Sequence, residues 1–186
     1  MSRAFVSVGS NIRPDENVRR AVRLLANAAS VVAVSTVYET EPEGRPEQQS
    51  YYNCVVEVET EAQPSALKQE LLAIEERLGR RRGDDKYAPR TIDLDLLVYD
   101  DLVVRSAELT LPDPDIGRRP YLAAALRELA PALTLPGSGV TIAEIAAGVG
   151  RKGLRPLDEY TMALRREIAH GQKRRENRRS GPAASG

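Results

Sequence analysis

The sequence predicts an α+β fold in which helices pack on one face of an antiparallel β-sheet. Segments rich in β-branched or alternating apolar residues are interspersed with segments whose apolar residues recur at helical spacing, in the order β-α-β-β-α-β. One strand segment, 53–60, alternates valine with glutamate, which is typical of an antiparallel strand with one solvated face. This order is the split βαβ, or ferredoxin-like, arrangement, with additional helices towards the C-terminus.

The first half of the chain predicts a strand, a helix and a second strand. Residues 4–9 alternate and end at Gly9-Ser10-Asn11, which favours a short strand followed by a turn. A helix is expected from Pro14 onwards, because proline and two acids open a run of apolar residues at helical spacing. Residues 31–38 are β-branched and predict one strand, and residues 40–46 predict a loop because they contain two prolines and a glycine.

The second half repeats this alternation. After the strand at 53–60, a helix is expected from Pro64 to the glycine at 79, because proline is tolerated in a first helical turn and glycine favours a stop. Residues 80–90 form a charged loop that enters a strand at 92–99. The remaining elements are expected to be short: a segment that pairs back at 102–104 and two helices at 121–129 and 142–147.

Composition excludes several classes of protein. The 186 residues, 41% hydrophobic and 29% charged, are ordinary for one globular domain with a tail. No apolar run approaches the roughly 20 residues that cross a bilayer, and the N-terminal residues lack a signal-peptide pattern, so we expect a cytoplasmic protein without membrane contact. Cys54 and His170 are the only residues of their kinds, which excludes an intramolecular disulfide, cysteine- or histidine-built zinc sites and a Ser-His-Asp triad.

The formal net charge of zero is the sum of two unlike parts. Residues 165–186 carry seven basic and two acidic groups, which leaves 20 basic and 25 acidic groups, a net charge of −5, in residues 1–164. We therefore expect residues 1–164 to form a single domain and residues 165–186 to be a basic, flexible tail that is too polar to bury much surface. A basic tail can bind nucleic acid, but a solvated terminus is the more frequent case, and nucleic acid is not an expected partner.

Paired carboxylates indicate a metal site. Asp93 and Asp95 lie two residues apart in the strand expected at 92–99, so their side chains share one face, roughly 6.5 Å apart. Two bare carboxylates at that spacing repel each other unless a cation lies between them, and hard oxygen ligands favour Mg²⁺. The alternative is that both are solvated acids on an edge strand.

A cationic loop precedes these carboxylates. It contains five basic residues within eleven positions: Arg80, Arg81, Arg82, Lys86 and Arg90. Arginine makes the forked hydrogen bonds that polyphosphates require, so loop and carboxylates together favour phosphoryl transfer. The chain contains no P-loop motif, and the G-x-G-x-x-G match at 148–153 follows a helical segment and opens none, so it is interpreted as an ordinary loop.

Four motifs together resemble one enzyme family. R-T-I-D-L-D-L-L at 90–97, Gly9-Ser10-Asn11, the segment from Tyr38 to Pro42, and Tyr51-Tyr52-Asn53 are similar in order and separation to the 6-hydroxymethyl-7,8-dihydropterin pyrophosphokinases. The resemblance covers residues 4–130. It implies transfer of diphosphate from ATP to the pterin hydroxymethyl group with release of AMP, two Mg²⁺ ions and a role in folate biosynthesis. The implied partners are ATP and hydroxymethyldihydropterin, bound by a monomer.

The resemblance also implies roles for individual residues. Asp93 and Asp95 would hold both metal ions, and Arg80 and Arg90 would stabilise the transferring group. The implied pterin-binding residues are Thr40, Glu41, Glu43, Tyr51, Asn53 and Tyr121. The implied ATP-binding residues are Glu75, Arg82, Lys86, Tyr87, Arg90, Thr110, Asp113, Pro114 and Arg119.

Some positions depart from the family pattern. Asp113 stands where the family has a histidine that can donate to a phosphate, Glu108 where a basic residue can serve ATP, and Glu43 where an apolar residue is usual. These changes leave open a divergent family member with a different acceptor or nucleotide. A ferredoxin-like RNA-binding module is a further alternative, but it requires stacking aromatic residues on central strands, and the strands at 4–9 and 93–99 offer only Phe5 and Tyr99.

Overall fold

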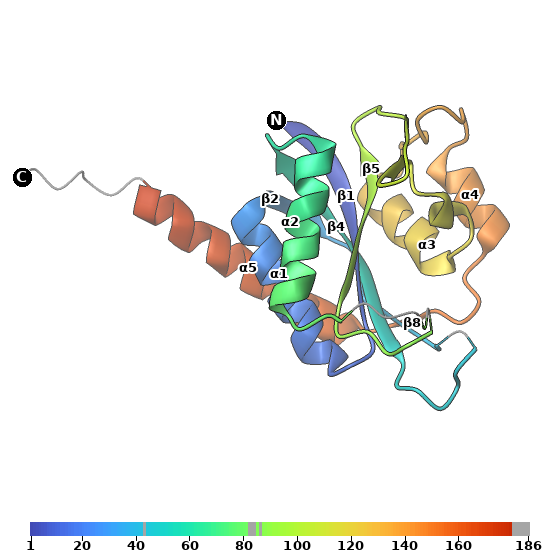
Figure 1. Cartoon of the computed structure of the whole chain (residues 1–186), viewed down its shortest axis with the longest axis horizontal. Helices are drawn as coiled ribbons and strands as arrows, with labels where there is room; N and C mark the ends of the chain where they lie inside the picture. The colour runs from blue at the N-terminus through green and yellow to red at the C-terminus, as the bar shows by residue number, and fades with distance from the viewer. Residues whose placement is uncertain (43, 82–84, 86, 180–186) are drawn as a thin grey trace, which may run out of the picture.

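The chain folds around one antiparallel sheet, described here for residues 1–42, 44–81, 85 and 87–179 of a computed structural model (Figure 1). The strands are β1 (Ser2–Ser10), β2 (Ser30–Val34), β3 (Tyr38–Thr40), β4 (Tyr51–Thr60), β5 (Asp93–Tyr99), β6 (Val104–Arg105), β7 (Thr110–Leu111) and β8 (Arg155–Pro156). The helices are α1 (Pro14–Ala28), α2 (Pro64–Arg77), α3 (Pro120–Leu129), α4 (Ile142–Val149) and α5 (Asp158–Arg179), with a 3₁₀ turn η1 (Pro114–Gly117). The sheet order is β5-β1-β4-β3-β8, with β2 also paired to β4, and the predicted ferredoxin-like arrangement is confirmed.

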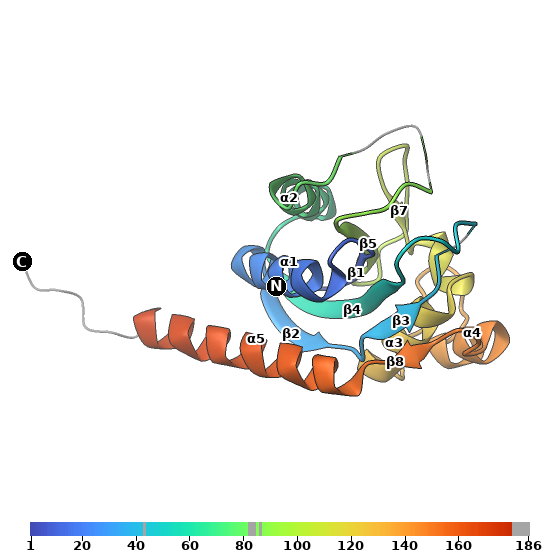
Figure 2. The ribbon, with the colours of Figure 1, turned by 90° about the horizontal axis from the view of Figure 1, so that it is seen from below.

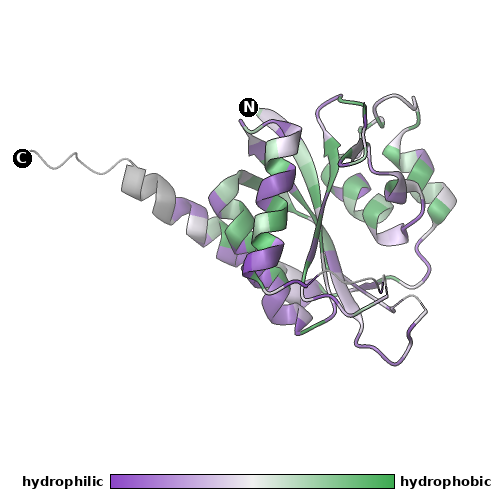
Figure 3. Ribbon diagram, in the orientation of Figure 1, coloured by the Kyte–Doolittle hydropathy of each residue, from purple (hydrophilic) through white to green (hydrophobic). Residues whose placement is uncertain are grey.

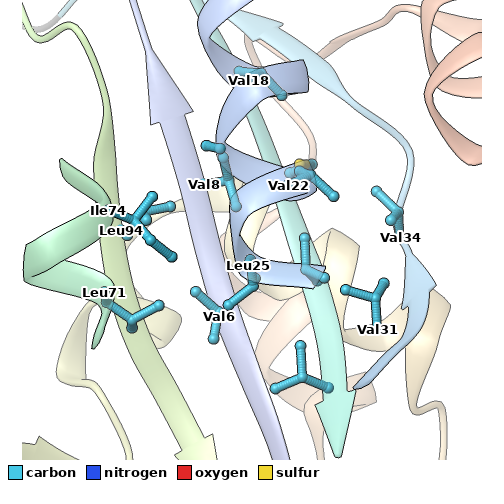
Figure 4. Close-up of a cluster of buried hydrophobic side chains, with 14 of the residues drawn as sticks. Val6, Val8, Val18, Val22, Leu25, Val31, Val34, Leu71, Ile74 and Leu94 are labelled. Atoms are coloured by element: carbon cyan, nitrogen blue, oxygen red, sulfur yellow. The ribbon is translucent and has the colours of Figure 1, made fainter. Parts of the chain in front are cut away.

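Strand alternation gives the sheet two different faces. On one face Val6, Val8 and Leu94 pack against α1 and α2 (Figure 4), and Leu164 of α5 joins the same core. On the other face Phe5 and the side chains near it pack against α3 and α4 in a second core. The expectation that helices cover only one face is therefore wrong, because α3 and α4 cover part of the opposite face (Figure 2).

The strand expected at 31–38 is two strands. β2 and β3 pair with the same strand, β4, but are separated by residues 35–37. Ser35 holds the segment between the two strands against β4. Its backbone N–H donates to the Val55 carbonyl and its hydroxyl accepts from the Val55 N–H, both at 2.9 Å. The Val37 N–H donates to the Thr161 hydroxyl at 2.9 Å, so side chains replace the regular hydrogen-bond ladder here.

One short element also differs from expectation. The segment after β5 does not pair back on β5; Val104 and Arg105 instead pair with β7 in a separate two-stranded sheet. The loop between β3 and β4 is largely hydrophilic (Figure 3) and projects beyond the lower end of the sheet.

The C-terminal helix α5 runs across the domain limit expected at residue 164. Leu164 and Ile168 are buried, Glu167 forms ion pairs with Arg19 and Arg23 of α1, and the Gln172 amide donates to the Val31 carbonyl of β2. Residues 165–172 therefore pack against α1 and β2. Among the described residues no helix is both long enough and apolar enough to cross a membrane.

The outer edge of β5 is held by side chains and a loop instead of another strand. The Leu94 N–H donates to Glu75 Oε1 at 2.8 Å, and Arg80 Nη1 donates to the Ile92 carbonyl just before the strand at 2.7 Å. Further along, the Asp113 N–H donates to the Leu97 carbonyl at 2.8 Å. These contacts fix the position of the strand that carries Asp93 and Asp95.

Candidate active site

A pocket of about 460 Å³ opens on the face of the sheet that α3 covers. Its floor follows from strand register: Gly9 of β1 lies opposite Asn53 of β4 on one side and opposite Asp93 of β5 on the other. Residues directly opposite in antiparallel strands point to the same face. Three strands therefore bring an amide, a bare backbone position and a carboxylate into one row across the pocket floor.

The carboxylates of β5 are neutralised by three basic side chains. Arg80 Nη1 lies 3.0 Å from Asp93 Oδ1, and Arg90 pairs with the other oxygen of Asp93. Lys68 Nζ of α2 lies 3.1 Å from Asp95 Oδ1. The two carboxylates face the pocket from one side of the strand, as their spacing predicts, and each has a cationic neighbour.

The donor set of this corner fits Mg²⁺. The two aspartates supply hard oxygen atoms, the ligands that magnesium prefers. In the described part of the chain no group of three or more histidine, cysteine, aspartate or glutamate side chains is arranged to hold an ion. A magnesium ion on Asp93 and Asp95 would therefore complete its shell with water and substrate oxygens, which is how proteins commonly bind it.

Next to these carboxylates lies a second acidic pair on η1. Asp113 caps this turn by accepting a hydrogen bond from the Asp115 N–H at 2.8 Å, and Asp115 accepts one from Arg119 Nε at 2.8 Å. Burial raises the pKa of Asp113, and the nearby charges of Asp95 and Asp115 add to this effect. The corner of the pocket at Asp113, where the resemblance implies a histidine, is thus electronegative.

The opposite end of the pocket is suited to a flat heterocycle. The Asn53 amide nitrogen donates to the Thr40 hydroxyl at 2.8 Å, which leaves the side-chain oxygen lying over Gly9. Burial raises the pKa of both Tyr51 and Tyr121, so both rings are neutral phenols near pH 7. Neutral aromatic faces and a fixed amide are suited to stacking on and reading a planar ring.

Most of the residues named from the sequence line this one pocket. They are Thr40, Glu41, Tyr51, Asn53, Tyr87, Arg90, Asp93, Asp95, Asp113, Arg119 and Tyr121. Arg80 does not line the pocket itself, but it forms an ion pair with Asp93, which does. Residues 43, 82 and 86, the predicted Glu43, Arg82 and Lys86, lie outside the described residues.

Three predicted ATP-binding residues do not line the pocket. Glu75 is 1% exposed and holds the edge of β5 through the Leu94 N–H. Thr110 begins β7, and Pro114 is exposed at the start of η1. Their proposed contacts with ATP remain predictions.

Several lining residues were not found from the sequence. They are Ser7, Gly9, Gln48, Asp115, Lys152 and, as a neighbour of Asp95, Lys68. Strand register supplies a signal for the first two, because Ser7 pairs with Asp95 and Gly9 with Asp93. Lys68 lies on a helix in the opposite layer and has no signal of that kind.

Comparison with known proteins identifies this arrangement. Residues 5–131 match the model of the 7,8-dihydro-6-hydroxymethylpterin-pyrophosphokinase (HPPK) family. A 2-amino-4-hydroxy-6-hydroxymethyldihydropteridine pyrophosphokinase of Synechocystis is 37% identical over 83% of this chain and 80% of its own length. The enzyme of the same name from Methylorubrum extorquens is 34% identical over 85% of this chain and its full length.

Solved structures support the fold. A Plasmodium falciparum HPPK-DHPS crystal structure superposes with a TM-score of 0.65 at 13% identity, over 78% of this chain. The chain spans 44% of that longer protein, so the match concerns one part of it. With the pocket described above and relatives at 34–37% identity over most of its length, the chain belongs to the 7,8-dihydro-6-hydroxymethylpterin-pyrophosphokinase family.

Proposed function

We propose that this chain transfers diphosphate from ATP to the hydroxymethyl group of 6-hydroxymethyl-7,8-dihydropterin and releases AMP, a step of folate biosynthesis. The observation that carries the proposal is the row Asn53–Gly9–Asp93 across the pocket floor. It spans two inter-strand spacings, about 10 Å. An acceptor ring read by Asn53 would thus extend its arm towards phosphates gathered at Asp93.

The pterin end would position the acceptor. Asn53 and Thr40, already joined by a hydrogen bond, would present an acceptor and a donor to the edge of the pyrimidinone ring. Tyr51 and Tyr121 would stack on the ring. Holding the hydroxymethyl oxygen near the β-phosphorus converts a bimolecular reaction into an effectively unimolecular one.

The β5 end would stabilise the transferring group. The hydroxymethyl oxygen forms a bond to the β-phosphorus, the bond from that phosphorus to the α-phosphate oxygen breaks, and AMP leaves. Arg90 and Arg80, both ion-paired to Asp93, would donate charge-assisted hydrogen bonds to the phosphate oxygens as charge redistributes. Two Mg²⁺ ions held by Asp93 and Asp95 would neutralise the triphosphate and orient it for in-line attack.

Product identity tests the proposal directly. ATP and Mg²⁺ should yield AMP at a catalytic rate only when 6-hydroxymethyl-7,8-dihydropterin is present, as measured by chromatography of the nucleotides. Release of ADP in place of AMP would contradict diphosphate transfer. Pterin binding without AMP release would favour a relative with another acceptor or nucleotide. The acidic corner at Asp113 is the observation that motivates this alternative.

Two finer expectations accompany the reaction. We expect the enzyme to act as a monomer, as the family resemblance implies. Cys54, the only cysteine, is buried without a disulfide, and a free thiol is compatible with the reducing cytoplasm that we expect for this protein.

A further inference from the structure

Lys68 contacts the pocket residue Asp95 although its helix, α2, lies on the opposite face of the sheet. α2 packs against the face that carries Leu94, whereas Asp95 points to the opposite face and into the pocket. β5 is the end strand in the sheet order, so a long side chain can pass around its outer edge. The Lys68 side chain does so: it is only 20% exposed, and its Nζ lies 3.1 Å from Asp95 Oδ1.

Arg80 follows the same route one step along the strand. It comes from the segment just after α2, donates to the Ile92 carbonyl at the edge of β5, and pairs with Asp93. The outer edge of β5 therefore carries two cations in a row, each aimed at one of the two predicted metal ligands. Arg80 is accounted for by the motifs of the family resemblance; Lys68 is not.

The charge of the pocket makes this second cation significant. Among the described lining residues five are acidic, and three are basic: Arg90, Arg119 and Lys152. A polyphosphate brings several more negative charges into the same space. Asp113, which faces it where a histidine is usual, repels it further, so the pocket needs a positive group near Asp95 that the motif itself does not supply.

We propose that Lys68 is a phosphate-binding residue. It reaches around the edge of β5 and supplies a positive charge in place of the histidine that is usual at position 113. The inference rests on the proposed function, because it takes a metal-bound nucleoside triphosphate as the ligand. When a divalent cation binds Asp95, the ammonium group leaves Oδ1 and turns to the nearest anions, the phosphate oxygens. Lysine suits this exchange because its ammonium is a compact charge on a flexible stem with three rotatable donors.

The test measures binding without turnover. The α,β-methylene analogue of ATP cannot break the bond that the reaction cleaves, so calorimetry with this analogue and Mg²⁺ reports affinity alone. Lys68→Met keeps an apolar stem along the strand edge but removes the charge. It should weaken binding of the magnesium analogue about 10-fold or more, the usual effect of one lost charge-assisted hydrogen bond.

A second measurement separates this role from a merely structural one. Without nucleotide, Lys68 competes with the metal for Asp95, so Lys68→Met should bind Mn²⁺ alone several-fold more tightly, as measured by electron paramagnetic resonance of free Mn²⁺. Lys68→Arg should retain most of the nucleotide affinity. Lys173→Met, at an exposed lysine of α5, is the matched control and should leave both affinities unchanged.

The outcomes distinguish this inference from the proposed function. Unchanged affinity of Lys68→Met for the magnesium analogue would overturn the inference, as would failure of the unmodified protein to bind that analogue. If the unmodified protein binds the analogue and Lys68→Met binds it weakly, the inference stands, even where no pterin-dependent AMP release is seen and the proposed acceptor is wrong.

Discussion

On one face of the sheet the buried apolar side chains of β1 run from Ala4 through Val6 to Val8, whereas on the other face they end at Phe5. The next two positions on that second face, Ser7 and Gly9, line the pocket instead. The first face is covered by α1, α2 and α5, and the second only in part by α3 and α4. The same strands thus carry a continuous apolar layer on one face. On the other face, one part is an apolar core under α3 and α4 and the remainder is the polar floor of the pocket.

This difference means that neighbouring residues in one strand have separate tasks. Asp95 and Leu94 are adjacent in β5, as are Asn53 and Cys54 in β4, and each pair divides between the pocket and the core. Substitutions on the pocket side should therefore change chemistry with little effect on stability, and those on the core side should do the reverse.

The largest effect is expected at Asp95. Asp95→Ala removes one of two carboxylates proposed to hold the metal, so turnover should fall by about 10³-fold or more. The melting temperature should stay close to that of the unmodified protein, because the Asp95 side chain is 43% exposed. Initial rates of AMP release and thermal unfolding are the measurements. Asp101→Ala, at an exposed acid beyond the strand, is the control; near-native turnover of Asp95→Ala would remove the metal assignment.

The adjacent residue should show the opposite behaviour. Leu94 is fully buried among α1 and α2, so Leu94→Ala should lower the free energy of unfolding by about 2–5 kcal/mol through lost burial and a residual cavity. Urea denaturation measures the change. Val32→Ala, at a side chain that is 52% exposed, should cost less than about 0.5 kcal/mol. Equal costs for the two substitutions would contradict the assignment of Leu94 to the core.

A smaller effect is expected at Gly9, where the pocket floor has no room for a side chain. A Cβ built there lies 2.6 Å from Asn53 Oδ1, so Gly9→Ala must turn the amide that is proposed to read the acceptor. We expect the KM for pterin to rise about 10-fold or more with a smaller change in the KM for ATP. Gly148→Ala, on α4 where an added Cβ would meet nothing within 4 Å, is the control. A uniform rise in both KM values would indicate a general disturbance of the sheet.

The last effect is a pH dependence of stability, and it concerns the thiol next to Asn53. Burial raises the pKa of Cys54 to about 12, whereas an unfolded thiol titrates near pH ~8.5. Above pH ~8.5 the unfolded chain ionises first, so the free energy of unfolding should decline with rising pH until about pH 12, by at most ~1.4 kcal/mol per pH unit from this group. Cys54→Ala should show a shallower decline in denaturation series from pH 8 to 10. Parallel curves for the two proteins would exclude this contribution.

Much of this division could be predicted from the sequence. Alternation in β4 and β5 predicted two-faced strands, and the spacing of Asp93 and Asp95 placed both on the pocket side. The break in the strand expected at 31–38 could not be predicted, because it depends on Ser35 bonding to Val55 and on Thr161 arriving from α5. These partners are distant in sequence, and local propensity carries no information about them.

The packing of α5 and the contact of Lys68 with Asp95 could not be predicted from residue patterns. The buried residues of α5, such as Leu164 and Ile168, form a sparse stripe in a charged segment, and a stripe of that kind is easily interpreted as a solvated tail. Lys68 lies on α2, in the layer opposite the pocket, and its contact with Asp95 requires β5 to be an end strand. Sheet order is a global property, so no motif around Lys68 could indicate its place.

The way in which β5 ends the sheet also bears on self-association. A strand with an open edge invites pairing with the edge of another molecule, the first step of many aggregates. Here Glu75, Arg80 and the backbone of Asp113 occupy hydrogen-bonding groups along that edge. Glu75 is 1% exposed, so it protects the edge through the hydrogen bond that occupies the Leu94 N–H. Because these groups are already occupied, they are unavailable to an incoming strand, which links solubility to the same strand that carries the carboxylates proposed to bind metal.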